Sequence, residues 1–175
     1  MHRNQIRRLT LTAMFIALGY LLPFLTGQIP QFGTMLGPMH IPALLCGFVC
    51  GWQYGLVAGA IMPLLRSATL GMPPMFPDAV AMAVELAAYG CAAGLLYRAL
   101  PKKIDFVYVA LVLSMLIGRA VWGLASAVLM MGTENAFTTQ AFLAGAFINA
   151  WPGIVLHILV IPPVVLGLRR AKLMD

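Results

Sequence analysis

Long apolar segments, separated by short polar or basic stretches, make up most of this chain. The pattern predicts six helical segments, at about 5–25, 40–50, 54–70, 77–98, 106–131 and 139–168. Apolar helices suit lipid because they pair their own backbone N–H and C=O groups. The second segment would be about 17 Å long, so we expect it to be tilted or sunk rather than to span alone. The sequence therefore predicts one domain, residues 1–175, that is an all-α integral membrane protein.

The composition excludes a soluble domain. Hydrophobic residues make up 62% of the chain and the mean hydropathy is +0.93, whereas soluble domains are about 45–50% apolar. The net charge of +6 does not indicate nucleic acid, because nine of the eleven Lys and Arg residues form three clusters beside apolar segments. These are Arg3, Arg7 and Arg8; Arg98, Lys102 and Lys103; and Arg169, Arg170 and Lys172. They are typical of membrane topology, and no nucleic-acid partner is expected.

The basic clusters also favour one reading of residues 40–70. This stretch has no charge before Arg66 and could form one long helix, which would give five spans and place two basic clusters outside. Lys and Arg concentrate in cytoplasmic loops, and six spans place all three clusters there. We therefore predict a bundle of six transmembrane helices with a short second helix, a tight turn near 51–53, and cytoplasmic N and C termini.

Four strongly ionisable side chains lie away from the flanks of the segments: Arg66, Asp78, Glu85 and Arg119. A guanidinium at membrane depth costs at least ~2.5–3.5 kcal/mol, so such a residue usually faces a cavity or a partner. Arg119 lies in an apolar run with no neighbouring acid. Asp78 is expected to cap the fourth helix, where a carboxylate suits the helix dipole.

The depths of the polar residues along their helices predict a site in the outer half of the bundle. A rise of about 1.5 Å per residue brings Arg66, Glu85, Arg119 and Asn149 to similar depth. Trp122 shares a helix face with Arg119, and Tyr89 shares one with Glu85. The predicted substrate-binding residues are Arg119, Glu85, Asn149, Arg66, Trp122 and Tyr89. Such a pocket suits a small ligand with a carboxylate plus hydroxyl or amide groups.

Each of these polar residues could instead have a purely structural role. Arg119 and Glu85 could form an ion pair between helices, and Arg66 could be an interfacial anchor. His157 is expected to be a hydrogen-bonded packing residue, and His40 a loop or cap residue.

Other chemistry finds little support in the sequence. The cysteines are odd in number and lack CxxC spacing, which disfavours a disulfide framework or a zinc site, and no metal or cofactor is expected. There is no HExxH or GxSxG motif and no nucleotide-binding loop, so we expect a non-catalytic protein.

Small residues recur at every fourth position in three places: at Gly47, Gly51, Gly55 and Gly59, at Gly90 and Gly94, and at Ala13 and Ala17. Most of the glycines are expected to pack helices within the chain, while the alanine pair could meet a second protein.

Several stretches together resemble the substrate-binding S components of energy-coupling factor (ECF) transporters, in the subgroup that binds riboflavin, pantothenate or folate. They are Ala13–Ala17, Gly37–Pro42, and Gly55–Ser67 followed by Gly71–Pro74. The size and the predicted topology also fit, so the resemblance covers essentially the whole chain.

The resemblance implies a subunit of an ABC-type importer in the bacterial cytoplasmic membrane. Such a subunit captures a vitamin from outside and works with a transmembrane coupling subunit and two cytoplasmic ATPases. It implies that Ala13 and Ala17 face the coupling subunit and that two loops, 26–39 and 71–76, gate the pocket. The gating residues would be Gln31, Phe32, Met72, Pro73 and Pro74.

Pantothenate is the first candidate ligand, because it is small and anionic and carries hydroxyl and amide groups. Riboflavin, folate, a queuosine precursor and a pyridoxine-like compound are alternatives. A small membrane enzyme or a secondary transporter that uses Glu85 and Arg119 is a further alternative.

Overall fold

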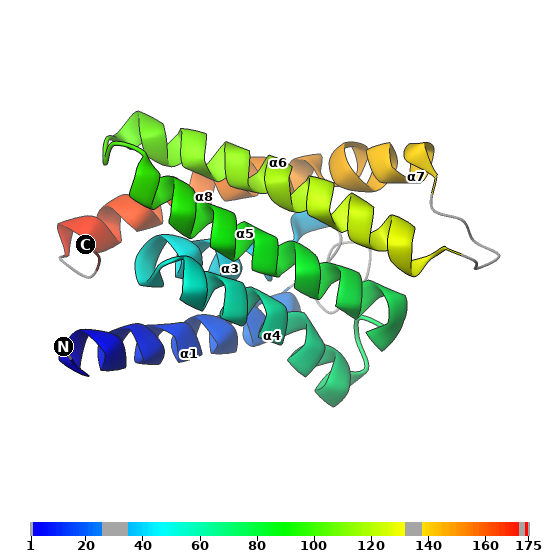
Figure 1. Cartoon of the computed structure of the whole chain (residues 1–175), viewed down its shortest axis with the longest axis horizontal. Coiled ribbons are helices and arrows are strands. Elements are labelled where there is room, and N and C mark those ends of the chain that lie inside the picture. Colours follow the sequence, from blue (N-terminus) through cyan, green and yellow to red (C-terminus); the bar gives the residue numbers. More distant parts are fainter. Residues whose placement is uncertain (1, 26–34, 132–137, 172–173, 175) are drawn as a thin grey trace.

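The computed structural model describes residues 2–25, 35–131, 138–171 and 174, and the regular structure among them is entirely helical (Figure 1). The elements are α1 (His2–Leu25), α3 (His40–Cys50), α4 (Trp52–Leu70), η1 (Met75–Ala79), α5 (Val80–Ala99), α6 (Ile104–Leu129), α7 (Thr139–Leu143), η2 (Ala144–Ile148) and α8 (Trp151–Arg170). Both η elements are π-helical. The predicted all-α class is confirmed, and each predicted segment coincides with one helix or with consecutive helices.

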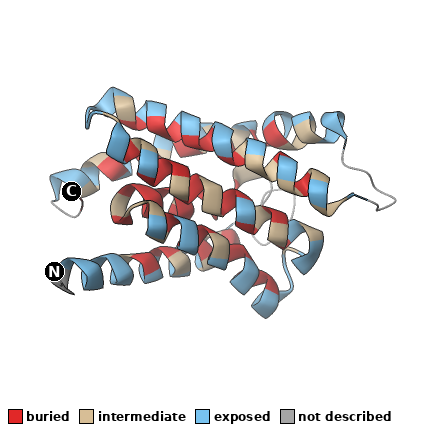
Figure 2. Cartoon of the chain, viewed as in Figure 1, coloured by how far each residue is buried: buried red, intermediate tan, exposed pale blue. Residues whose placement is uncertain are grey.

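The segment that contains α5 forms the centre of the bundle. Among the described residues, four segments are long and apolar enough to cross a membrane: Asn4–Leu25, Met75–Ala99, Ile104–Leu129 and Thr139–Arg170. In the most apolar stretch of Met75–Ala99, 56% of the residues are buried, against 33% or less in the corresponding stretches of the other three segments. α5 packs against α3, α4 and α6, whereas α1 packs on α3 and α4. Figure 2 shows the buried residues on the inward faces and exposed residues on the outward ones.

Glycines bring the backbones of α4 and α5 into direct contact. A Cβ atom on Gly90 would lie 2.2 Å from the carbonyl oxygen of Gly55, and one on Gly59 would lie 2.2 Å from that of Leu86. A Cβ atom on Gly47 of α3 would likewise lie 2.2 Å from the Gly90 carbonyl oxygen. Small residues allow such close approach where lipid supplies no hydrophobic driving force between helices. The predicted packing role of these glycines is confirmed.

Gly51 separates α3 from α4. Its φ of +100° lies in a region that favours glycine over residues with a Cβ atom. The helix before it ends at Cys50 and the next begins at Trp52. Residues 40–70 therefore form two helices, as predicted, and not one.

Basic side chains from three parts of the chain lie at one end of the bundle, which we call the basic end. α1 begins there, α5 ends there and α8 ends there (Figure 1). The residues are Arg7, Arg8, Arg98, Lys102, Lys103, Arg169 and Arg170. The Arg169 guanidinium donates a hydrogen bond to the carbonyl oxygen of Lys102, which links the end of α8 to the turn between α5 and α6.

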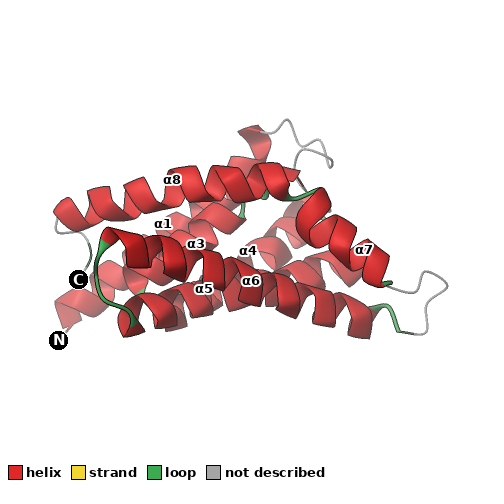
Figure 3. Ribbon diagram, turned by 90° about the horizontal axis from the view of Figure 1, so that it is seen from above, coloured by secondary structure: helices red, strands yellow, loops and turns green. Residues whose placement is uncertain are grey.

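The last predicted helix is interrupted. α7 and η2 end in a turn at Asn149 and Ala150, and α8 begins at Trp151. Figure 3 shows a bend where α7 leads into α8. Pro152, at the start of α8, is tolerated there because the first helical N–H groups have no partner within a helix.

Candidate ligand-binding site

Glu85 is the centre of a buried polar cluster built by three helices. Its side chain, on α5, is 2% exposed. The Arg119 Nη1 atom of α6 lies 3.0 Å from Glu85 Oε1, and the His40 Nε2 atom of α3 lies 3.4 Å from the same oxygen. A buried carboxylate requires such partners, because an unpaired charge away from water is very costly.

The carbonyl oxygen of Gly37 joins this cluster to α8. The backbone N–H of His40 donates to it at 2.9 Å, His40 Nδ1 lies 3.1 Å from it, and His157 Nε2 lies 3.3 Å from it. A carbonyl oxygen only accepts hydrogen bonds, so both ring nitrogens that face it carry hydrogen. Gly37 has a φ of +53°, and a Cβ atom there would lie 2.8 Å from His40 Nδ1. The two histidines thus hold the end of the segment that leads into α3.

The tautomer of His40 determines how its ring interacts with Glu85. Because Nδ1 carries hydrogen, a neutral His40 presents the lone pair of Nε2 to the carboxylate. This geometry gives no hydrogen bond between Nε2 and Glu85 Oε1, and both atoms lack a hydrogen-bond partner among the described residues.

Several polar atoms of the cluster lack a well-formed hydrogen bond within the described residues. They are Glu85 Oε1, His40 Nε2 and Arg119 Nε. An unsatisfied buried polar group costs about 1–3 kcal/mol. Together they offer a ligand two acceptors, Glu85 Oε1 and His40 Nε2, and one donor, Arg119 Nε, in a small volume. Such convergent polar groups in an apolar setting are typical of small-molecule sites.

Aromatic rings surround the cluster. Tyr89, one turn after Glu85 on α5, meets the His40 ring edge-on with 5.2 Å between centroids, and the His157 ring stacks on the same His40 ring at 5.8 Å. The Arg119 guanidinium lies 6.0 Å from the ring of Trp122, a distance at which a cation is attracted to an aromatic face. Trp122 in turn stacks on Phe142 of α7 at 6.2 Å.

The structure brings together four of the six predicted site residues: Arg119, Glu85, Tyr89 and Trp122. The predicted convergence of Asn149 is wrong, because it is exposed in the turn before α8. The interruption of the helix there removes the regular geometry on which its predicted depth and face depended.

Arg66 is also separate from the cluster, and its predicted convergence is wrong. It is 4% exposed, its Nη1 atom donates to the carbonyl oxygen of Tyr20 at 2.9 Å, and its guanidinium lies 5.0 Å from the ring of Phe24. It therefore fastens α4 to the final turns of α1. A cation suits this position, since the carbonyl end of a helix carries partial negative charge.

His40 and His157 are the site residues that the sequence reasoning missed. The sequence reading gave them a cap role and a packing role. A histidine inside an apolar helix, as at His157, is a signal of the same kind as Arg119, because imidazole needs a polar partner away from water.

The predicted gating and interface residues are only partly described. Gln31 and Phe32 lie outside the described residues. Met72 and Pro74 are exposed, and Pro73 is half-buried, in the stretch between α4 and η1. Ala13 and Ala17 are exposed on α1. Within the described part of the chain, no group of three or more His, Cys, Asp or Glu side chains is placed to hold a metal ion.

Comparison with known proteins identifies the family. The family model described as "ECF transporter, substrate-specific component" matches residues 7–165. Among curated proteins and among solved structures, no match was found. The match spans α1 to α8 and includes every residue of the Glu85 cluster. The chain belongs to the family of substrate-specific components of ECF transporters.

Proposed function

We propose that this chain captures a small micronutrient at the Glu85 cluster and delivers it through an ATP-driven complex. Membership of a family of substrate-specific transport components supports this role. The observation that carries the location is the buried cluster of Glu85, Arg119 and His40, whose polar atoms are only partly satisfied. The subunit itself is non-catalytic, and the energy comes from two ATPases bound to a coupling subunit.

The topology is part of the proposal. The chain crosses the bacterial cytoplasmic membrane six times, with both termini and the basic end in the cytoplasm, as the positive-inside rule favours. The ligand enters from outside between two gating segments, which contain Gln31 and Phe32, and Met72–Pro74. The histidine contacts to Gly37 support this arrangement, because they connect the cluster to the chain that follows the first gating segment.

Pantothenate is the first candidate ligand. Its carboxylate would pair with Arg119 in a charge-assisted contact, while its hydroxyl and amide groups would meet Glu85 and His40. Trp122 and Tyr89 would contact its apolar part. Folate, the other acidic candidate, is larger and would need a second cation.

One observation favours a second candidate class, an uncharged polar ligand. Glu85 already lies 3.0 Å from Arg119, so the positive charge is compensated before any ligand binds. A neutral ligand would add hydrogen bonds without separating this pair. Riboflavin, a pyridoxine-like compound and a queuosine precursor are candidates of this kind.

A matched pair of ligands tests both candidates. Pantothenate and its alcohol analogue pantothenol differ only in the carboxylate, and a thermal-shift screen of the purified protein would compare both with the other vitamins. If pantothenate is the ligand, it alone stabilises the protein, and Arg119→Gln weakens binding by about 2–5 kcal/mol. Asn149→Ala, a polar change outside the cluster, leaves binding intact. Stabilisation by no micronutrient would contradict the proposed function.

A further inference from the structure

Two neighbouring cavities at the basic end share Gln53 and Tyr54, at the start of α4. One is an apolar groove of about 420 Å³ between α1 and α4. The other has a volume of about 570 Å³ and basic lining, and we call it the basic cavity. Both lie outside the Glu85 cluster.

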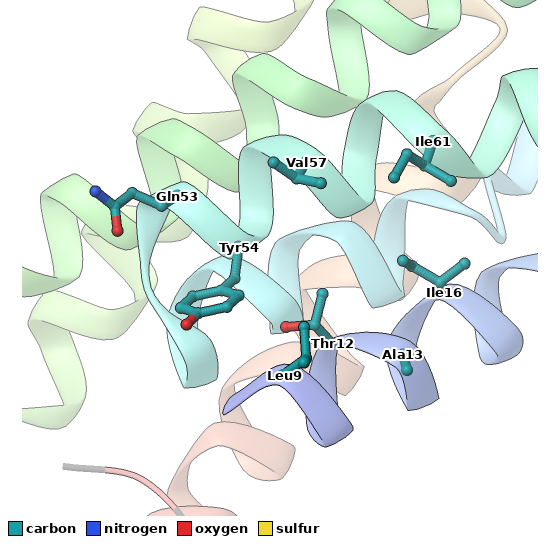
Figure 4. A pocket seen from close by; sticks show the side chains of 8 residues that line it. All are labelled: Leu9, Thr12, Ala13, Ile16, Gln53, Tyr54, Val57 and Ile61. Atoms are coloured by element: carbon teal, nitrogen blue, oxygen red, sulfur yellow. The ribbon is translucent and has the colours of Figure 1, made fainter. Parts of the chain in front are cut away.

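The apolar groove follows about two turns of each helix. Figure 4 shows Leu9 and Ile16 of α1 on one side and Val57 and Ile61 of α4 on the other. Thr12 also faces it, but its hydroxyl already donates to the carbonyl oxygen of Arg8 at 2.7 Å. Val57 is 49% exposed, so the groove opens outward, to the bilayer in a membrane protein. Its surface suits a hydrocarbon chain.

The basic cavity carries the chemistry of an anion site. Arg8, Arg98 and Lys102 line it from α1, α5 and the turn after α5. The first turn of α4 also lines it, and the N-cap residue Gly51 supplies no side-chain cap. The N–H groups of a first helical turn have no partner within the helix and favour negative charge.

Tyr97 is a second, independent sign of a ligand in the basic cavity. It is 8% exposed, yet its hydroxyl has no hydrogen-bond partner among the described residues. Its ring is held edge-on by Phe48 at 5.5 Å and lies 5.9 Å from the ammonium of Lys102. A buried hydroxyl without a partner is costly, and Tyr97 lines the basic cavity. An anionic oxygen in the cavity would accept its hydrogen bond.

We propose that the two cavities together bind one anionic phospholipid, with the phosphate in the basic cavity and an acyl chain in the apolar groove. An amphipathic ligand explains why the two cavities share Gln53 and Tyr54. Free phosphate would leave the groove unused, and an acidic peptide would not match its apolar surface. Lys and Arg residues near an anionic membrane surface favour the binding of anionic lipids. The proposal requires only that the chain is a membrane protein and does not depend on the vitamin.

Native mass spectrometry of the purified full-length protein tests this site. Phosphatidylglycerol and phosphatidylcholine of equal chain length are added in detergent. We expect one phosphatidylglycerol per chain, retained about tenfold or more above phosphatidylcholine. Equal retention of the two lipids would overturn the proposal. So would retention of neither lipid, the result expected if only a protein partner fills the cavities.

Two variants separate the headgroup contacts from the general charge of this end. Arg98→Gln with Lys102→Gln should reduce phosphatidylglycerol retention to the level of phosphatidylcholine. Lys103→Gln with Arg170→Gln removes the same charge from the same end without touching the cavity, and should change nothing. Tyr97→Phe keeps the ring and should weaken retention about threefold, the value of one hydrogen bond. Equal loss in both double variants would contradict a specific site.

The groove needs its own test, because binding of phosphate alone would also involve the basic cavity. Ile61→Trp fills the groove and should lower phosphatidylglycerol retention, whereas Leu64→Trp, exposed on the same helix but outside the groove, should not. Inorganic phosphate should compete only weakly with the lipid. Full competition by phosphate, or an Ile61→Trp variant that retains lipid normally, would replace the lipid with a free anion and overturn the proposal.

Discussion

His157 Nε2 lies 3.3 Å from the carbonyl oxygen of Gly37, so α8 holds the end of the segment that leads into α3. The same oxygen faces His40, whose other ring nitrogen faces Glu85. The buried cluster and the chain beyond the first gating segment are thereby joined through two imidazole rings. A substitution in the cluster should therefore alter the chain that leads into α3, and a substitution in that chain should alter the cluster.

Replacement of His157 by Phe should weaken ligand binding about fivefold. The change keeps an aromatic ring but removes one hydrogen bond, which is typically worth about 1 kcal/mol. Hydrogen exchange of residues 35–39 should also increase. Leu159→Phe, on the exposed face of α8, is the control. Unchanged exchange and binding in the His157 variant would mean that this contact does not hold the segment.

The ion pair between Arg119 and Glu85 should contribute to stability as a unit. Glu85→Gln leaves a buried guanidinium without its acid, and breaking such a pair costs about 3–5 kcal/mol. Arg119→Gln should cost a similar amount. Combining both changes should cost less than their sum by about 0.5–3 kcal/mol, measured by thermal denaturation in detergent. Strict additivity would show that the 3.0 Å contact carries no coupling.

Arg66→Leu should lower stability and leave ligand binding unchanged. The variant loses a charged hydrogen bond to the Tyr20 carbonyl oxygen, a contact typically worth about 1.5–3 kcal/mol. Thermal denaturation and a binding titration on the same preparation would measure the two effects. Lost affinity at normal stability would return Arg66 to the binding site.

The contact between α4 and α5 should not tolerate even one methyl group. Gly90→Ala would place a Cβ atom 2.2 Å from the Gly55 carbonyl oxygen, and such overpacking typically costs about 1–3 kcal/mol. Gly167→Ala, in α8, meets nothing within 4 Å and should be neutral or slightly stabilising. Equal melting temperatures for the two variants would show that the helices separate easily.

Ala13→Trp should abolish uptake in cells and leave ligand binding by the purified subunit intact. Ala13 is exposed on α1 and lines the apolar groove. We propose that the coupling subunit docks on this face in the assembled complex, in place of the acyl chain, and a bulky ring prevents close helix approach. Met14→Trp, about 100° around the helix, is the control. Loss of binding in the Ala13 variant would mean that this face of α1 builds the pocket.

The helices were predictable because their signals are local. Gly51, for instance, separates two apolar runs, and the helix boundaries at His40, Cys50 and Leu70 match the predicted segments. The proximity of Arg119 and Glu85 was also predictable, since a chain with few charges in its apolar spans offers few partners.

The rest of the cluster depends on relations between distant segments. Depth along a helix does not determine the direction in which a side chain points, so Arg66 was assigned to the cluster although it faces α1. Asn149 was misplaced because the π-helical η2 and the turn after it break the helical period. The role of His157 depends on a carbonyl group 120 residues away, which no local pattern reveals.

The glycine contact between α4 and α5 has a mechanical consequence. Where backbones touch directly, there are few side-chain rotamers to rearrange, and the two helices have little freedom to slide. Gly47 of α3 packs against the Gly90 carbonyl oxygen of α5, so we expect α3, α4 and α5 to move as one rigid unit. Glu85 and His40 belong to this unit, whereas Arg119 and His157 are on α6 and α8. We therefore expect the cluster to open by a movement of α6 and α8 away from the other three helices.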